Sequence, residues 1–382
     1  MDKHTPEITI KIDGSTSIAT DSGQKLETRG GSGIVSVQVD LRLDNPDLFA
    51  VEFDMMALEQ LNLIDAFKPG SEIEISMGLE KSGVLCTGEV TYIEPSFDVE
   101  SGYRTTISGY HKLHRLTRGH RSFTWGDGIK ADQVPTTAVS DIINKSKAHE
   151  GSKTSDKMSV GQLTSTDLKL KYIPQLNLSD FEFLRAIGAT LEYKAEPDAT
   201  SKVKFVKPDP SQTPIVKLAR DRKETGTVFI LQANFRLSTV QQYAAVEVRS
   251  WDPETKKNIV AKVTSSSYSF AASVKGAADT GKGLYGSASD GRKYVVVDQP
   301  VGSQAEAKSL AQSLFDQFSM DFMTGEAVIN GDPRIVPGCT VEFVGFGKAF
   351  SGVYLVTSAT HSYRPEEGYR TTIAVARNAK GA

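Results

Sequence analysis

The residues with the most potential for chemistry lie in the segment HKLHRLTRGH, which holds His111, His114 and His120. Spacings of three and six residues could bring two imidazoles together as metal ligands. The segment contains no cysteine and no acidic residue that could complete a ligand set. We therefore expect three ordinary surface histidines here and no metal site.

The same stretch is the most basic part of the chain, with no acidic residue between Ser101 and Gly126. One interpretation is a phosphate-binding patch, with Phe123 and Trp125 available for stacking. The other is a surface that pairs with an acidic partner across an interface, which the balanced net charge of −3 favours. The cations concerned are Arg104, Lys112, Arg115, Arg118 and Arg121.

A glycine pattern further along the chain is the remaining candidate for a bound ligand. Gly281–Gly286 (GKGLYG) fits G-x-G-x-x-G, but a dinucleotide site needs a strand before it and a helix after it. The residues SASDG follow, which predicts a loop. The sequence holds no nucleophile elbow, zinc-protease or P-loop motif, and no two acids stand out as a glycosidase pair. We predict no catalytic residues, no cofactor and a protein that is not an enzyme.

Composition is ordinary for a globular chain, with 39% hydrophobic and 24% charged residues. The near-neutral charge gives no general attraction to nucleic acid or to an anionic membrane. No apolar run approaches the roughly 20 residues that cross a bilayer, and the first residues show no secretory signal. Cys86 and Cys339 stand in unrelated contexts and form no disulfide framework, which fits synthesis in a reducing cytoplasm.

The elements that must position these residues are indicated by an internal repeat. The hexapeptide GYRTTI occurs at Gly102–Ile107 and again at Gly368–Ile373. Each copy follows a Pro-Gly pair, at Pro69 and Pro337, and then the tripeptide Ser-Gly-Val, in the same order and at nearly the same spacing. Three blocks in one order predict a duplicated domain.

The repeat also predicts where the two copies differ. LRLDNPDLFAVEF (Leu41–Phe53) resembles FRLSTVQQYAAVEV (Phe235–Val248). The offset between copies is 194 residues at this block and 268 at the Pro-Gly block, so the second copy carries about 74 additional residues. We place this insertion at about 250–325.

Alternation of apolar and polar residues predicts that each copy is built from half-buried strands. Val35–Leu43, Phe49–Phe53 and Ile73–Met77 all alternate with a period of two. Glu74 and Glu342 lie at the polar phase and are interpreted as solvated strand charges. We predict a mainly β protein with two related tube-like antiparallel β-barrel domains and an α+β insert, divided as residues 1–125, 126–212 and 213–382.

Helical patterns occupy the middle of the chain and the insertion. Val134–Ala148 is expected to form a helix, and a capping box at Ser179-Asp-Phe-Glu182 opens a second at Phe181–Gly188. Another capping box, at Ser303-Gln-Ala-Glu306, starts a helix in the insertion. The remaining expected elements are strands at Leu191–Ala195 and Lys202–Val206, and a long mobile loop at Ser265–Gly291.

Four linked segments resemble the hub family of contractile phage tails, the phage late control D proteins. They are GEVTYIEPSFD with GYRTTISGYHKLHRLTRG, NLSDFEFLRAIGATLEY, VEVRSWDPETKK, and SGVYLVTSATHSYRPEEGYRTTIAVARN. The resemblance covers nearly the whole chain in the family's order. It extends to the hub portion of valine-glycine repeat spike proteins and to extracellular contractile injection particles.

The resemblance implies a role as well as a fold. Hubs of this family are homotrimers whose two tube-like domains per chain offer a pseudo-sixfold ring to a hexameric inner tube, while the other end holds a trimeric spike. The implied partners are the inner tube protein, the spike protein and other baseplate subunits, in a bacterial phage tail or injection particle. Many relatives continue into an OB-fold and a spike, whereas this sequence stops at Ala382, so we expect the spike on a separate chain or outside this sequence.

Two other function classes stay open at this stage. One is a tail-associated cell-wall hydrolase, which would need a convergent acidic or Cys/His cluster in a cleft. The other is a receptor-binding baseplate module, which would need an exposed aromatic shelf. The chain has 8% aromatic residues and only two tryptophans, which offers little excess for such a shelf.

Overall fold

The computed structural model describes most of the chain between residues 6 and 380. The gaps are 15, 20–32, 61–62, 80, 101, 126–138, 140–141, 144–157, 171–172, 199–201, 222–225, 269 and 271–291. The expected GKGLYG loop lies outside the described residues, as do most of Ser265–Gly291 and of Val134–Ala148. Of the last segment, Val139, Ile142 and Ile143 are described, and all three are helical and buried.

Seven strands form the N-terminal domain, whose sheet order is β3-β4-β7-β6-β5-β1-β2. Its core contains the apolar phase of each strand, including Val39, Phe49 and Ile107. The alternation in the sequence therefore identified the side of each strand that is buried. The elements are β1 (Glu7–Ile12), β2 (Thr16–Ala19), β3 (Ile34–Arg42), β4 (Leu48–Asp54), α1 (Met55–Gln60), η1 (Ile64–Ala66), β5 (Glu72–Gly78), β6 (Gly83–Asp98) and β7 (Gly102–His111).

The C-terminal strands close into a six-stranded barrel, because order β19-β13-β14-β18-β21-β20 is completed by pairing of β19 with β20. The barrel confirms the predicted mainly β fold class. It is not wholly antiparallel, since β13 pairs in parallel with both β14 and β19. The elements are β13 (Val216–Ala219), β14 (Val228–Leu237), β18 (Met323–Asn330), β19 (Thr340–Val344), α6 (Gly347–Phe350), β20 (Gly352–Arg364) and β21 (Gly368–Arg377).

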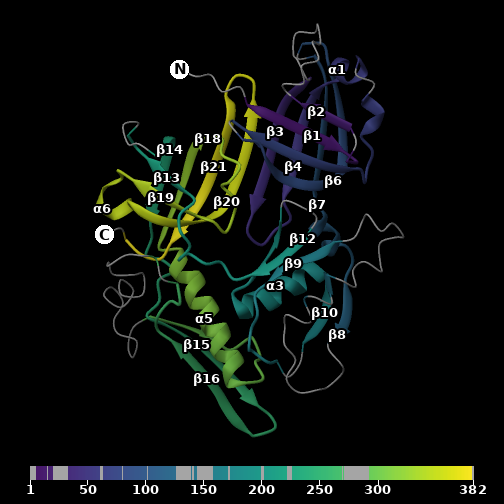
Figure 1. The fold of residues 1–382 in the computed structure, drawn as a ribbon. Helices are drawn as coiled ribbons and strands as arrows, with labels where there is room; N and C mark the ends of the chain where they lie inside the picture. Colours follow the sequence, from purple (N-terminus) through teal and green to yellow (C-terminus); the bar gives the residue numbers. More distant parts are fainter. Residues whose placement is uncertain are drawn as a thin grey trace.

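Strand β20 joins the two β-domains into one sheet of 13 strands. Its first residues pair with β19 and close the barrel, while Ser358–Tyr363 pair antiparallel with Val37–Arg42 of β3. We call this β20–β3 pairing the seam. Figure 1 shows the result, with β20 and β21 lying beside the strands of the N-terminal domain.

A small α+β domain follows the first set of strands. Its helix begins at the predicted capping box, where the Ser179 side chain accepts from the Glu182 N–H and Glu182 accepts from the Ser179 N–H. Trp125, Phe183 and Phe205 lie in its core. The elements are η2 (Lys112–Thr117), β8 (Arg121–Thr124), β9 (Ser159–Leu163), β10 (Pro174–Leu178), α3 (Asp180–Leu191), β11 (Lys194–Pro197) and β12 (Lys202–Val206).

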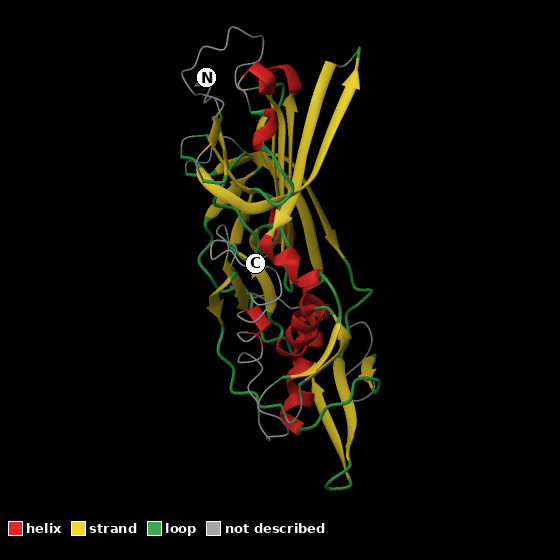
Figure 2. Cartoon of the chain, turned by 90° about the vertical axis from the view of Figure 1, so that its right-hand side faces the viewer, coloured by secondary structure: helices red, strands yellow, loops and turns green. Residues whose placement is uncertain are grey.

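The insertion in the second β-domain forms a separate sheet packed on a helix. The sheet comprises β15 (Ala245–Asp252), β16 (Lys257–Val263) and β17 (Lys293–Val296), with order β16-β15-β17. Its inner face packs on α5 (Gln304–Met320), whose N-cap is Ser303 as predicted. Figure 2 shows the elongated molecule from the side, with the long strands of the β-domains toward one end and helices both at that end and farther along.

The predicted correspondence of Leu41–Phe53 with Phe235–Val248 is wrong in two respects. Leu41 was matched to Phe235, whereas the strand pairings equate Val37 with Ala233 and therefore Leu41 with Leu237. Ala245–Val248 was matched to β4, but this segment belongs to β15 of the separate sheet, and the strand that pairs with β14 is β18. The barrel is therefore interrupted between Leu237 and Met323, which begins earlier than the expected 250. Alternation reports which face of a strand is buried but not which sheet the strand joins.

Candidate interaction surfaces

The two GYRTTI segments form β7 and β21, and each pairs with the preceding strand in the same register. Asp98 lies opposite Gly102 in one hairpin, and Arg364 lies opposite Gly368 in the other. Both glycines have positive φ, 89° and 71°, which L-residues rarely adopt. The shared hexapeptide therefore begins at equivalent turns.

Farther from the turns, the hairpins share an irregularity and a set of hydrogen bonds. The register shifts between Val90 and Tyr92 in β6 and between Val356 and Ser358 in β20. Before each shift a Pro-Gly turn is bonded to the strand, since the Gly70 N–H donates to Val90 C=O at 2.8 Å and the Gly338 N–H donates to Val356 C=O at 2.9 Å. A bulge with the same neighbours in both hairpins is a specific structural feature rather than a defect.

The recurring glutamates also occupy equivalent positions. Glu74 pairs with Lys11 of β1 at 2.7 Å, and Glu342 pairs with Lys217 of β13 at 3.1 Å. Both carboxylates are part-exposed and face a lysine directly across the strand pair. This geometry matches the interpretation of surface strand charges, and such pairs contribute little stability.

The seam contains one buried imidazole and one outer polar contact. His361 is fully buried; its Nδ1 lies 2.8 Å from the Tyr369 hydroxyl and its Nε2 lies 3.0 Å from Ile335 C=O. Burial lowers the pKa of His361 to about 4, so the ring is neutral at pH 7. On the other face, the Thr360 hydroxyl donates to Asp40 Oδ1 at 2.6 Å.

The basic stretch does not form an exposed cationic patch, which corrects both interpretations drawn from its sequence. Four of its five cations contact acids of the same chain that are distant in sequence, and the fifth, Arg118, contacts His114. Trp125 is buried and donates to Gln175, so it offers no stacking surface. The ion pairs are Arg104 with Glu52, Lys112 with Glu72, Arg115 with Glu89, and Arg121 with Asp180.

The imidazole rings of the three histidines do not converge on one point, and two of the three side chains are not on the surface. His111 is fully buried and its Nδ1 accepts from the Leu113 N–H. His114 is largely buried, with Nδ1 3.0 Å from His111 C=O and Nε2 2.8 Å from Arg118. His120 is exposed and lies 3.5 Å from Glu182. Within the described residues, no group of three or more acids, histidines or cysteines could hold a metal ion.

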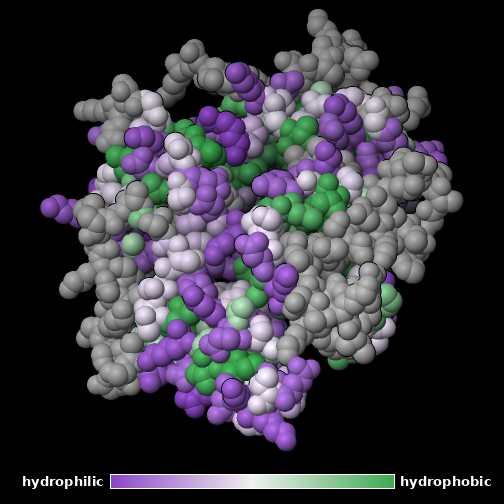
Figure 3. Space-filling view, turned by 60° about the horizontal axis from the view of Figure 1, so that its bottom comes forward, coloured by the Kyte–Doolittle hydropathy of each residue, from purple (hydrophilic) through white to green (hydrophobic). Residues whose placement is uncertain are grey.

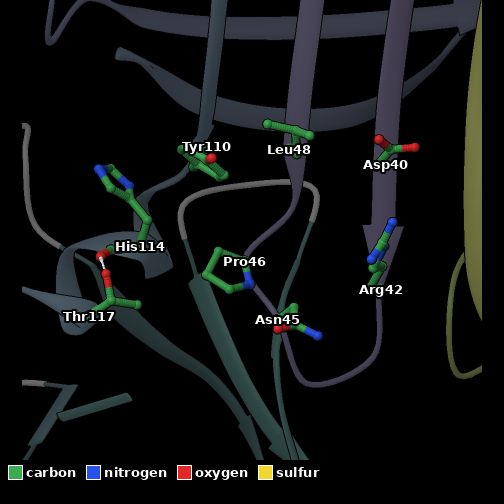
Figure 4. Close-up of a pocket in the computed structure, with 8 residues that line it drawn as sticks. All are labelled: Asp40, Arg42, Asn45, Pro46, Leu48, Tyr110, His114 and Thr117. Carbon is green, nitrogen blue, oxygen red and sulfur yellow. Dashed lines mark hydrogen bonds between the residues drawn. The ribbon is translucent and has the colours of Figure 1, made fainter. Parts of the chain in front are cut away.

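A pocket of about 500 Å³ lies where the N-terminal domain meets η2. Figure 4 shows Asp40 and Arg42 from β3 on one side and Tyr110 and His114 on the other. Burial lowers the pKa of His114, and its Nε2 accepts from Arg118, so its ring is neutral at pH 7. The lining mixes one cation, one anion and apolar surface, and presents no set of groups converging on a substrate.

A second hollow, of about 330 Å³, lies between α3 and α5. Glu192 lines it and pairs with Lys207 at 2.8 Å. Burial, reinforced by the charge of Asp316, raises the pKa of Glu192 to about 8. Asp316 itself is fully buried and accepts from the Ser267 N–H at 2.6 Å and from the hydroxyls of Ser266 and Ser267.

Exposed apolar side chains include those of the β6–β7 hairpin and of the small sheet. The outer part of the β6–β7 hairpin carries Tyr92, Phe97 and Tyr103, with the Phe97 and Tyr103 rings 5.7 Å apart. The small sheet exposes Trp251 and Val260. Figure 3 shows the lower end of the molecule, where apolar groups are small and separated by polar side chains.

Comparison with known families gives the identification. A family model described as the Alg8 N-terminal domain matches residues 54–364, which is most of the chain. The chain belongs to the Alg8 N-terminal domain family. The matched region contains β5, β6 and β7 of the N-terminal domain, the α+β domain, the insertion and the C-terminal barrel as far as the end of β20. No curated protein sequence matches this member of the family.

Solved structures with the same fold come from phage tails and secretion machinery. The chain superposes on a 43 kDa tail protein of prophage MuSo2 from Shewanella oneidensis with TM-score 0.65 and 17% identity, covering 98% of both chains. A tail protein from Neisseria meningitidis MC58 gives TM-score 0.66 and 11% identity, over 98% of this chain and 97% of that one. A type VI secretion component, the E. coli c3393 protein, gives 0.52 and 11%, over 91% and 76%. The chain thus has the fold of these tail proteins.

None of the helices in the described ranges is long and apolar enough to span a bilayer.

Proposed function

We propose that this chain is the central baseplate hub of a contractile phage-like tail or injection particle, related to late control D proteins. In this role a homotrimer joins a hexameric inner tube to a trimeric spike and contacts other baseplate subunits. The proposal is supported by the shared fold with two tail proteins and a type VI secretion component over at least 91% of this chain.

The observation that carries the proposal is the pair of equivalent hairpins in one continuous sheet. β6–β7 and β20–β21 share their turn, register and bulge, and the seam holds their two domains side by side. Two like domains per chain give six like domains in a trimer. A trimer can therefore match a tube of six subunits while keeping three equivalent positions for a trimeric spike, since closed assemblies favour matched interfaces.

We further propose that the chain is not an enzyme. A hydrolase remains the alternative because Glu192 has a raised pKa and lines a hollow. Asp316, whose charge helps raise the pKa of Glu192, accepts hydrogen bonds from Ser266, Ser267 and Gln312, which ties it to the structure around α5 rather than to a substrate. A receptor-binding module has less support, because the exposed aromatics that lie together on one hairpin, Tyr92, Phe97 and Tyr103, offer only a small surface.

Cryo-electron microscopy of the assembled particle tests the hub proposal directly. We expect three copies of this chain in the layer between tube and spike, with the N-terminal and C-terminal β-domains alternating around one ring. Six copies in that layer, or copies whose two β-domains do not alternate, would contradict it.

A further inference from the structure

Among the described strands of the β-domains, β6 and β14 each have a stretch with a partner on one side, and the internal repeat indicates how these two stretches fit together. β5 pairs with β6 as far as Glu89, so among the described strands Tyr92–Phe97 pair on one side alone, with β7. β13 pairs with β14 at Val228 and Phe229, so within the described part of the chain the strand that pairs with Ile230–Leu237 is β18. Open edges of this kind are templates for pairing with another chain.

These open edges are the counterparts of the two strands that meet in the seam. The GYRTTI blocks equate β20 with β6, so Ser358–Tyr363 correspond to Tyr92–Phe97. The strand pairings likewise equate β3 with β14. In the N-terminal domain Val37 lies opposite Val51, which lies opposite Ile107. In the C-terminal domain Ala233 lies opposite Ala327, which lies opposite Ile373, the counterpart of Ile107 in the repeat. A shift in register at Ile34/Ser36 and at Ile230/Gln232 supports the same correspondence.

We propose that β6 of one chain pairs antiparallel with β14 of a second copy of this chain, in the register of the seam. The proposal rests on the homotrimer of the proposed function and names the surfaces that close it. Within a chain, the C-terminal domain presents β20 to β3 of the N-terminal domain. Repeating that step, the N-terminal domain presents β6 to β14 of the next chain, and three such contacts complete the ring.

The register transferred from the seam gives pairs whose chemistry is consistent on both faces. Toward the core side, Ile93 meets Leu237; the two are 36% and 38% exposed in the single chain. On the other face Glu94 meets Arg236, in place of the hydrogen-bonded Thr360 and Asp40 of the seam. The full set is Ile93–Leu237, Pro95–Phe235 and Phe97–Ala233 on the apolar side, and Tyr92–Ser238, Glu94–Arg236 and Ser96–Asn234 on the polar side.

Apolar pairs on one face of the sheet and polar pairs on the other are what a correct register requires. A slip by one residue would place each apolar side chain against the polar face of the partner strand. Opposite charges that face each other across an antiparallel pair are favourable, and like charges are not. Pro95 supplies no N–H to the ladder, which weakens this edge and protects the free chain from indiscriminate pairing.

Paired cysteines test both the surface and its register. The variant Ile93→Cys with Leu237→Cys places thiols at opposite positions, within the range in which a disulfide forms. Assembled particles carrying it, oxidised and run on a non-reducing gel, should show this chain linked to itself as dimers and trimers. The control Glu94→Cys with Leu237→Cys is offset by one residue, faces the other side of the sheet and should remain unlinked.

The outcomes separate this inference from the proposed function. A hub layer of three copies in which the Ile93/Leu237 cysteines do not link, or in which β6 links to another particle protein, overturns the β6–β14 pairing and leaves the hub role intact. A hub layer without three copies overturns both.

A charge exchange keeps the test informative if the cysteine variants fold poorly. Glu94→Arg and Arg236→Glu each place like charges at the contact and should reduce incorporation of the chain into particles. The double variant restores an opposite pair at each of the three contacts and should recover incorporation. If the double variant assembles no better than the single variants, Glu94 and Arg236 do not face each other.

Discussion

Glu196 on β11 is held between the α+β domain and the C-terminal barrel. It is 9% exposed, and the Pro337–Gly338 turn of the barrel lies beside its carboxylate. Burial raises the pKa of Glu196 to about 7, against the attraction of Lys204 and Lys194 and with added repulsion from Asp44. A carboxyl in this position makes the junction between domains sensitive to pH in the neutral range.

The raised pKa of Glu196 predicts how the free energy of unfolding depends on pH. Because the pKa of Glu196 is higher in the folded chain than in the unfolded one, its contribution to stability is complete at acid pH and is lost as pH rises through about 7. Urea unfolding measured at about pH 5 and at about pH 8 gives the loss of unfolding free energy between these two pH values. This loss should be smaller in Glu196→Gln than in the parent. The difference should be up to about 1.4 kcal/mol for each unit of pKa shift.

The exposed carboxylate Glu366 supplies the control, as Glu366→Gln should lose as much stability as the parent over this range. An identical loss in Glu196→Gln and in the parent would show that Glu196 titrates normally.

At the level of single residues, the sequence showed which side chains were charged or titratable, but it did not show which residues they contact. The cations of the basic stretch are evident in the sequence, but the acids that pair with them, such as Glu52 and Asp180, lie 50 or more positions away. Strand pairing brings these residues together, and alternation alone does not specify it. For the same reason His111 and His114 were expected at the surface and are buried.

Among the elements, the β6–β7 pair accommodates a ring of the neighbouring strand through two glycines. A Cβ at Gly109 would lie 1.8 Å from Glu89 C=O and 2.7 Å from the Phe49 ring, and a Cβ at Gly88 would lie 2.8 Å from the same ring. The absence of side chains at these two positions therefore lets Phe49 fill the core of the N-terminal domain. The corresponding residues of the second hairpin are Tyr354 and Val375, so this arrangement belongs to the first β-domain.

Gly109→Ala should consequently separate β6 from β7. We expect a loss of about 1–3 kcal/mol of unfolding free energy, the range for overpacking a core. Thermal unfolding followed by circular dichroism measures it, with Ser108→Ala on the adjacent face of β7 as control. A Gly109→Ala variant as stable as the Ser108→Ala variant would mean that the strands adjust without cost.

Elements with strong local signals were predicted well, and those defined by distant pairing were not. The capping box at Ser179 and the N-cap at Ser303 are local, and helices begin at both. β13 has only four residues, and nothing local indicates that it closes a barrel between β14 and β19. Ala245–Val248 of β15 was assigned to the barrel because it resembles Ala50–Phe53 of β4, and a short local resemblance does not show which sheet a strand joins.

For the whole molecule, the proposed role predicts an absence of hydrolytic activity. The purified chain should leave a peptidoglycan zymogram without clearing, and Glu192→Gln should behave in the same way. Clearing by the parent that Glu192→Gln abolishes would assign Glu192 as a general acid and favour the hydrolase. Clearing that persists in Glu192→Gln would point to a different site or to a contaminant, which a mock purification distinguishes.

The double use of β20 has a mechanical consequence. One covalent strand closes the C-terminal barrel and also carries the seam, so a force that separates the two β-domains is transmitted directly into the barrel wall. Hydrogen bonds of an antiparallel pair run across the strands. A pull along the strand axis therefore loads the bonds of the seam together in shear, whereas a pull across it opens them one at a time. In a particle that contracts, the orientation of β20 relative to the axis of motion would set how much load the ring withstands.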